Sequence, residues 1–118
     1  MKYELRQRLA AAGIDADAAV ERFMGSEELY LRFLYKFPED PCCGELREAA
    51  ARMDAEGMLR AAHTLKGVCG NLSINSLYEL LLRQVELLRM GKPAEAADMM
   101  SEITEAYNAV VAVCGVSE

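Results

Sequence analysis

Residues 54–90 read DAEGMLRAAHTLKGVCGNLSINSLYELLLRQVELLRM, and they contain two amphipathic patterns separated by a short polar break. Asp54 is a typical N-cap residue, so we expect a helix from about residue 55 to residue 71 or 72. The leucine-rich pattern that follows predicts a second helix over about 76–90. Because the connection is short, we expect the two helices to pack as antiparallel neighbours.

The remaining sequence shows the same alternation of helical patterns with glycine and proline. Further helices are expected over about 2–12, 15–24, 26–37, 45–53 and 94–113. Pro38 to Gly44 is expected to be a loop. The 18 Ala and 15 Leu residues far outnumber the 10 Val and Ile residues, which favours helices over strands. We therefore predict an all-α helical bundle, formed by one domain over residues 1–118.

The composition also excludes several classes of protein. The net charge is −6 with a pI of about 4.9, which argues against nucleic-acid binding. No apolar run is long enough to span a membrane, and the N-terminus lacks the apolar segment of a signal peptide, so we expect a cytoplasmic protein. In that reducing compartment we expect free thiols at the four cysteines, namely Cys42, Cys43, Cys69 and Cys114.

His63 is the one histidine in the chain, and it lies in the expected helix over about 55–72. A helical projection places it opposite the apolar stripe formed by Met58, Ala61, Leu65, Val68, Cys69 and Leu72. A single histidine in a helical protein often has no special role. The position of His63 away from the stripe nevertheless argues against a buried structural histidine.

The surroundings of His63 are unusual in two ways. Gly67 and Gly70 lie on its helix face, where each costs about 1 kcal/mol relative to Ala and leaves room for a close approach. Gly70 could equally admit a neighbouring helix or begin the C-cap. No Asp or Glu occurs between Gly57 and Tyr78, where about three or four would be expected, so Arg60 and Lys66 predict a positive patch.

An imidazole beside cations is suited to carrying a phosphoryl group. Neutral imidazole is a nucleophile near physiological pH, and phosphoryl transfer depends mainly on positioning and charge stabilisation. Lys66 could supply that charge. The sequence has neither a Gly-x-x-x-x-Gly-Lys phosphate loop nor a Gly-x-Gly-x-x-Gly motif, so we predict a carrier without kinase machinery rather than an enzyme.

The stretch HTLKGVCGNL, residues 63–72, resembles the signature of histidine-containing phosphotransfer (HPt) domains of bacterial phosphorelays. Similarity extends to residues 13–23 and 28–37 upstream and to the leucines of 77–81 downstream. The resemblance implies an up-down antiparallel four-helix bundle with extra short N-terminal helices. It also implies that His63 accepts a phosphoryl group from the phosphoaspartate of a response-regulator receiver domain and passes it to another receiver.

The resemblance assigns roles to neighbouring residues. Lys66 would stabilise the phosphate, and Gly67, with Gly70, would leave room for the receiver's active site. Leu59 and Arg60 would contribute to docking, and Asn71 would have a structural role near the helix end. Two positions depart from the family pattern. Ser73 replaces the usual glycine after the histidine helix. Val85 stands where many members have a polar residue near the phosphoacceptor. The adjacent Gln84 is therefore either a partner-binding residue in that role or a polar residue at the bundle edge.

The expected partners are receiver domains or a hybrid histidine kinase, with no cofactor on this chain and Mg²⁺ on the partner receiver only. We expect a monomer, and the start at Met1 suggests a stand-alone protein, although a domain cut from a hybrid kinase stays open. One alternative function is a helical adaptor that binds receivers or kinases without being phosphorylated. A metal-binding bundle is a more distant alternative.

Overall fold

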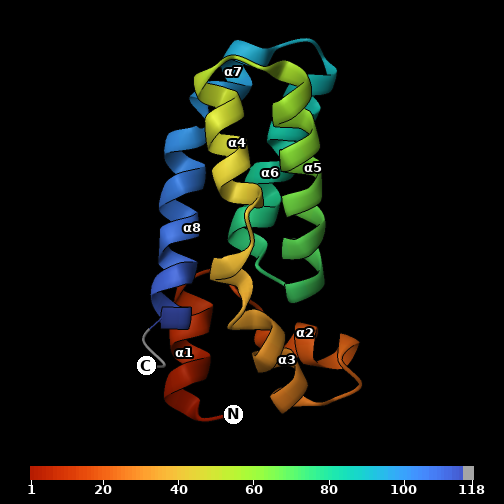
Figure 1. Cartoon of the computed structure of the whole chain (residues 1–118). Helices are drawn as coiled ribbons and strands as arrows, with labels where there is room; N and C mark the ends of the chain where they lie inside the picture. The colour runs from red at the N-terminus through yellow and green to blue at the C-terminus, as the bar shows by residue number, and fades with distance from the viewer. Residues whose placement is uncertain (116–118) are drawn as a thin grey trace.

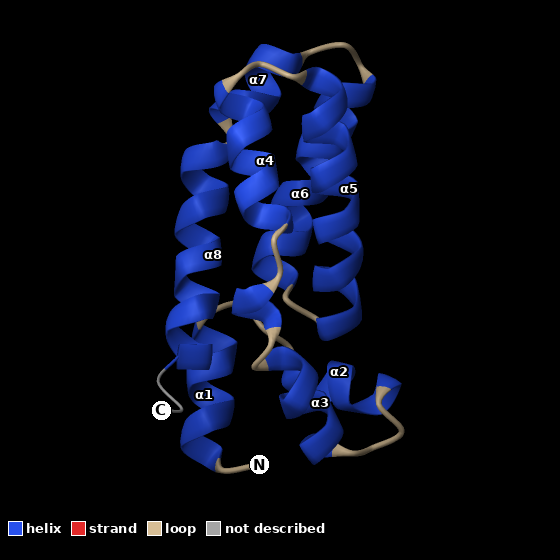
Figure 2. Cartoon of the chain, in the orientation of Figure 1, coloured by secondary structure: helices blue, strands red, loops and turns tan. Residues whose placement is uncertain are grey.

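The helical patterns of the sequence correspond to real helices in the computed structural model, which describes residues 1–115. These residues form eight α-helices and one short 3-10 helix. Figure 2 shows the helices joined by loops and turns. The elements are α1 (Tyr3–Ala11), α2 (Ala16–Arg22), α3 (Glu27–Leu34), η1 (Phe37–Glu39), α4 (Cys42–Ala51), α5 (Ala55–Leu72), α6 (Asn75–Arg89), α7 (Pro93–Asp98) and α8 (Met100–Gly115). The prediction of an all-α protein is therefore confirmed.

Helices α4, α5, α6 and α8 lie side by side and alternate in direction, which makes an up-down four-helix bundle (Figure 1). The most extensive packing is that of α5 against α4 and α6. The described chain measures 43 × 26 × 20 Å along its principal axes. This elongated bundle leaves one long face of α5 without a covering helix, as is normal for a four-helix arrangement.

The short helices α1, α2 and α3 gather at the end of the bundle where α5 terminates (Figure 1). The Tyr30 hydroxyl donates to the Leu72 carbonyl over 2.9 Å, and the Asp15 amide donates to the Ser73 carbonyl over 2.9 Å. Ile14 and Ile74 add an isolated antiparallel bridge. The predicted N-terminal helices are thus present, and they satisfy carbonyl groups that the end of α5 would otherwise leave unpaired.

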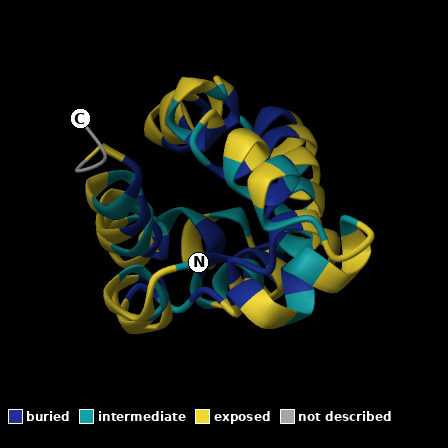
Figure 3. Cartoon of the chain, turned by 90° about the horizontal axis from the view of Figure 1, so that it is seen from below, coloured by how far each residue is buried: buried dark blue, intermediate teal, exposed yellow. Residues whose placement is uncertain are grey.

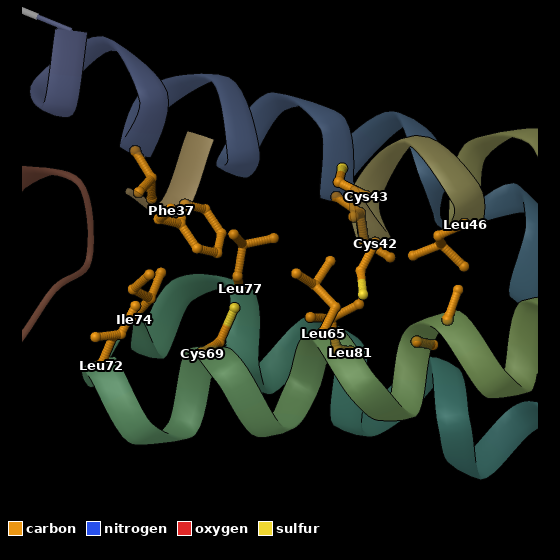
Figure 4. Close-up of a cluster of buried hydrophobic side chains, with 14 of the residues drawn as sticks. Phe37, Cys42, Cys43, Leu46, Leu65, Cys69, Leu72, Ile74, Leu77 and Leu81 are labelled. Atoms are coloured by element: carbon orange, nitrogen blue, oxygen red, sulfur yellow. The ribbon is translucent and has the colours of Figure 1, made fainter. Parts of the chain in front are cut away.

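The core lies between the inward faces of the four long helices (Figure 4). Leu46, Leu65, Leu77 and Leu81 are fully buried, and each such side chain stabilises the fold by about 1.5–3 kcal/mol. In the view of Figure 3, the buried residues lie on the inward faces of the helices, while the outer faces are exposed. The apolar spacing of the sequence therefore predicted the direction in which the helices face.

The cysteines belong to this core. Cys42, Cys43 and Cys69 are buried free thiols, as expected. Cys114 is also buried, and its thiol donates to the Leu34 carbonyl over 3.5 Å. Burial raises the pKa of Cys69 to about 12, because a thiolate loses its hydration in the core. These thiols pack as small apolar side chains rather than as reactive groups.

Three predicted boundaries were wrong. The helix expected over about 26–37 ends at Leu34 as α3, and Phe37 belongs to the separate 3-10 helix η1. Helix α4 begins at Cys42 rather than Glu45, because the Asp40 carboxylate accepts a hydrogen bond from the Cys42 amide over 2.8 Å and organises the first turn. The helix predicted over 94–113 is divided at Met99 into α7 and α8. There the Ala96 carbonyl accepts from the side-chain amide of Gln84 over 2.9 Å and from the Met99 amide in a tighter turn, instead of extending one regular helix.

Candidate functional site

Helix α5 positions His63 on the outside of the bundle. The Asp54 carboxylate caps the helix by accepting from the Gly57 amide over 3.0 Å, as the sequence predicted. On the inner face Met58, Leu65 and Cys69 are fully buried, whereas His63 on the opposite face is exposed. The core packing of α5 therefore fixes the orientation of the helix and turns the imidazole toward solvent.

An open hollow of about 310 Å³ lies beside His63. Four of its lining residues come from α5, and one comes from α6: Glu56, Leu59, Arg60, His63 and Arg89. The half-buried Leu59 contributes an apolar side, while Arg60 and Arg89 contribute guanidinium groups. Lys66 is half-buried one turn beyond His63 on α5 and does not line this hollow.

The charges near His63 are available to an outside group. The ion pairs within residues 1–115 involve the N-terminus, Arg6, Arg52 and Lys92 as cations. Arg60, Lys66 and Arg89 take part in none of these pairs. The predicted cations Arg60 and Lys66 are therefore unpaired, and Arg60 lines the hollow beside His63, but Glu56 brings a carboxylate into the same hollow.

The two glycines near His63 have different surroundings. Gly67 is exposed, and a Cβ added there would meet no neighbouring atom within 4 Å. A Cβ added at Gly70 would come within 3.2 Å of Cε1 of the Tyr78 ring. Gly67 thus leaves open space beside His63, as predicted, whereas the missing side chain of Gly70 admits Tyr78 of α6. For Gly70 the structure favours the helix-packing alternative over the partner-binding one.

The prediction that Gln84 binds a partner was wrong. Gln84 is fully buried, and its amide nitrogen donates to the Ala96 carbonyl over 2.9 Å and contacts Sδ of Met100 at 3.4 Å. Its Oε1 has no hydrogen-bond partner within the described part of the chain. Gln84 therefore joins α6 to the break between α7 and α8, and it presents no surface to another protein.

Sequence reasoning missed Arg89, because it examined only the residues near His63 along the chain. The contact of Gly70 with Tyr78 sets the register between α5 and α6. About three helical turns before Gly70 on α5 comes Leu59, and about three turns after Tyr78 on α6 comes Arg89. An antiparallel pairing of the two predicted helices could therefore have placed Arg89 beside the site.

The turn after α5 explains the departure at Ser73. Ser73 has a φ of 55°, a left-handed conformation that closes the helix and that glycine adopts more easily. The Arg22 guanidinium donates to the Ser73 hydroxyl over 2.6 Å and to the Asn71 carbonyl over 3.3 Å. The serine therefore keeps the glycine-like turn and ties it to α2. Asn71 itself is exposed at the end of α5.

Within residues 1–115, no three His, Cys, Asp or Glu side chains lie together in a way that could hold a metal ion. Of the helices that these residues form, none has the length and apolar character needed to cross a membrane.

Comparison with known protein families gives one match. The family model described as Hpt domain matches residues 38–113, from η1 through most of α8. Helices α1 to α3 lie outside the matched segment. No curated protein and no solved structure matches the chain.

Proposed function

Because this chain belongs to the Hpt domain family, which acts in phosphorelays, we propose that it carries a phosphoryl group on His63 between receiver domains. The observation that supports this role most directly is the exposed imidazole on α5, with unpaired cations beside it and open space at Gly67. Hpt domains carry phosphoryl groups and are not kinases. The donor in this proposal is therefore the phosphoaspartate of a receiver.

The transfer step requires little from this chain beyond a positioned nucleophile. The lone pair of an imidazole nitrogen of His63 forms a bond to phosphorus. The P–O bond to the aspartate breaks, and its electron pair stays on the carboxylate oxygen. The imidazolium that forms then releases its N–H proton to water, and the reverse sequence delivers the phosphoryl group to the next receiver.

Lys66 and Gly67 support this step in different ways. Lys66, one turn after His63, is proposed to stabilise the phosphoryl oxygens with its ammonium group. Gly67 is proposed to let the receiver approach the imidazole closely. Leu59 and Arg60 are proposed to contact the receiver at the adjoining hollow. The partner receiver is proposed to supply the aspartate and Mg²⁺.

We also propose that the chain acts in the cytoplasm as a monomer, and that it forms one domain. Residues 116–118 of that domain lie outside the described part.

The test is phosphoryl transfer from labelled, phosphorylated receiver domains of the same organism. We expect a base-stable, acid-labile label on the wild type, no label on His63→Gln, and a normal label on Thr64→Ala, whose site is the exposed neighbour of His63. Lys66→Ala should keep its fold but accept the group more slowly or lose it sooner. Absence of label with every receiver would refute the carrier role, and binding without labelling would support the adaptor alternative. Equal labelling of His63→Gln would refute the site.

A further inference from the structure

The hollow next to His63 has the size and composition of an anion site. Its volume of about 310 Å³ exceeds that of a phosphoryl group, and His63 forms part of its wall. The remaining lining comes from Glu56, Leu59 and Arg60 on α5 and from Arg89 on α6. A group attached to the imidazole on this side would therefore face two guanidinium groups carried by two different helices.

Arg89 is well suited to bind such a group. Guanidinium groups present N–H donors in a planar fork that matches two oxygens of a phosphoryl group. Arg89 is exposed and takes part in none of the ion pairs within residues 1–115. It lies in the last turn of α6, where the helix carbonyls favour a cation, so its position is compatible with helix stability.

We propose that Arg89 is a further residue of the phosphoryl site, binding the oxygens of a phosphoryl group on His63 together with Arg60. This proposal rests on the proposed role of His63 as the acceptor. Lys66 would act from the turn after His63, while the two arginines act from the hollow before it. The Glu56 carboxylate opposes them, because it is a negative charge in the same hollow. Glu56 therefore limits how strongly the hollow retains the group.

Phosphoramidate, a small phosphoryl donor, allows the role of Arg89 to be tested without a partner protein. The imidazole lone pair attacks its phosphorus, the P–N bond breaks, and ammonia leaves with the electron pair. The phosphoimidazolium then loses its N–H proton to water. Intact-mass spectrometry follows the formation of phosphohistidine, and its later loss gives the half-life. Arginines bound to the oxygens of the phosphoryl group on His63 reduce the electron donation from those oxygens toward phosphorus, and so slow the breaking of the N–P bond.

Arg89→Ala is expected to shorten the half-life about three- to tenfold, the range for a charged hydrogen bond weakened by solvent. Arg89→Lys should recover part of the loss, and Glu56→Gln should lengthen the half-life. The matched control is Arg83→Ala, an exposed α6 arginine outside the hollow, which should behave as wild type. Urea unfolding confirms that each variant is folded.

Two outcomes overturn the proposal. If Arg89→Ala has the half-life of Arg83→Ala, Arg89 does not bind the group. If Glu56→Gln shortens the half-life, the charge argument is wrong. Failure of the proposed function gives a different result. In that case phosphoramidate would still label His63, and the half-life of the label would still depend on Arg89, but no receiver would transfer a phosphoryl group to His63.

Discussion

The pairing of Arg22 with Ser73 allows a quantitative prediction about the end of the histidine-bearing helix. Ser73 is buried with a φ of 55°, and Arg22 donates to its hydroxyl over 2.6 Å. The perturbation is Ser73→Gly, introduced both into the wild type and into Arg22→Ala. Because glycine removes the hydroxyl that accepts this hydrogen bond, Ser73→Gly should have different effects in the two backgrounds.

The magnitude follows from two opposing contributions. A non-glycine residue in the left-handed region costs about 1–2 kcal/mol, which Ser73→Gly would remove. Glycine also makes the unfolded state more flexible, which offsets part of this effect, so the backbone contribution of Ser73→Gly is a net stabilisation of about 1 kcal/mol. A hydrogen bond from a charged donor contributes about 1.5–3 kcal/mol, reduced to about 1 kcal/mol because Arg22 is exposed to solvent. Ser73→Gly should therefore be nearly neutral in the wild type and stabilise Arg22→Ala by about 1 kcal/mol.

Urea unfolding followed by far-UV circular dichroism measures the four free energies of the cycle. Arg22→Ala alone should lower the free energy of unfolding by about 1–2 kcal/mol, because it also removes the bond to the Asn71 carbonyl. Arg32→Ala is the matched control, since Arg32 is an exposed α3 arginine without a hydrogen bond or ion pair within residues 1–115. Equal effects of Ser73→Gly in both backgrounds would refute the reasoning.

Three further predictions concern the site and the core. Gly67→Ala should raise the free energy of unfolding by about 1 kcal/mol yet slow transfer from a receiver, and an unchanged transfer rate would contradict the clearance role of Gly67. Gln84→Met should change the free energy of unfolding by less than about 1 kcal/mol, because it loses one hydrogen bond but also removes a buried oxygen without a partner. Labelling of His63 should stay intact. Defective labelling in a stable variant would show that Gln84 belongs to the site. Stability should fall as the pH rises above about 9, since burial raises the pKa of Cys69 from 9.0 to about 12, so that only the unfolded state releases the thiol proton. Thermal melts between pH 8 and pH 10 measure this slope, and Cys69→Ala should have a shallower one.

The helices that the sequence predicted well are those whose ends are set by nearby residues. Asp15, Ser26 and Asp54 each cap a helix with their own side chains, by accepting a hydrogen bond from the amide three residues later. Such contacts depend on local sequence alone, so a pattern of polar cap and apolar periodicity is sufficient to locate them. The same holds for the outward direction of His63, which follows from the apolar stripe on the other side of α5.

Most of the features that sequence reasoning missed depend on contacts between distant residues; the start of α4 at Cys42 differs, because the Asp40 carboxylate that organises it lies only two residues earlier. The break at Met99 arises where Gln84 of α6 donates to the Ala96 carbonyl, and no local signal marks it. Burial of Gln84 follows from its position between helices, whereas its residue type suggests the surface. Arg89 reaches the site through the packing of α5 against α6, of which the close approach of Tyr78 to Gly70 is a part.

The electrostatics of the site show the same difference between order along the chain and proximity in space. The net charge of −6 is spread over the molecule, but salt at physiological strength screens exposed charges beyond about 8 Å. The potential at His63 therefore depends mainly on the groups that line its hollow and on Lys66. Arg89 enters that set from another helix, and Glu56 enters it from just outside the acid-free stretch. An acidic protein can thus hold an anion at this position, and the balance among these few charges sets how firmly it does so.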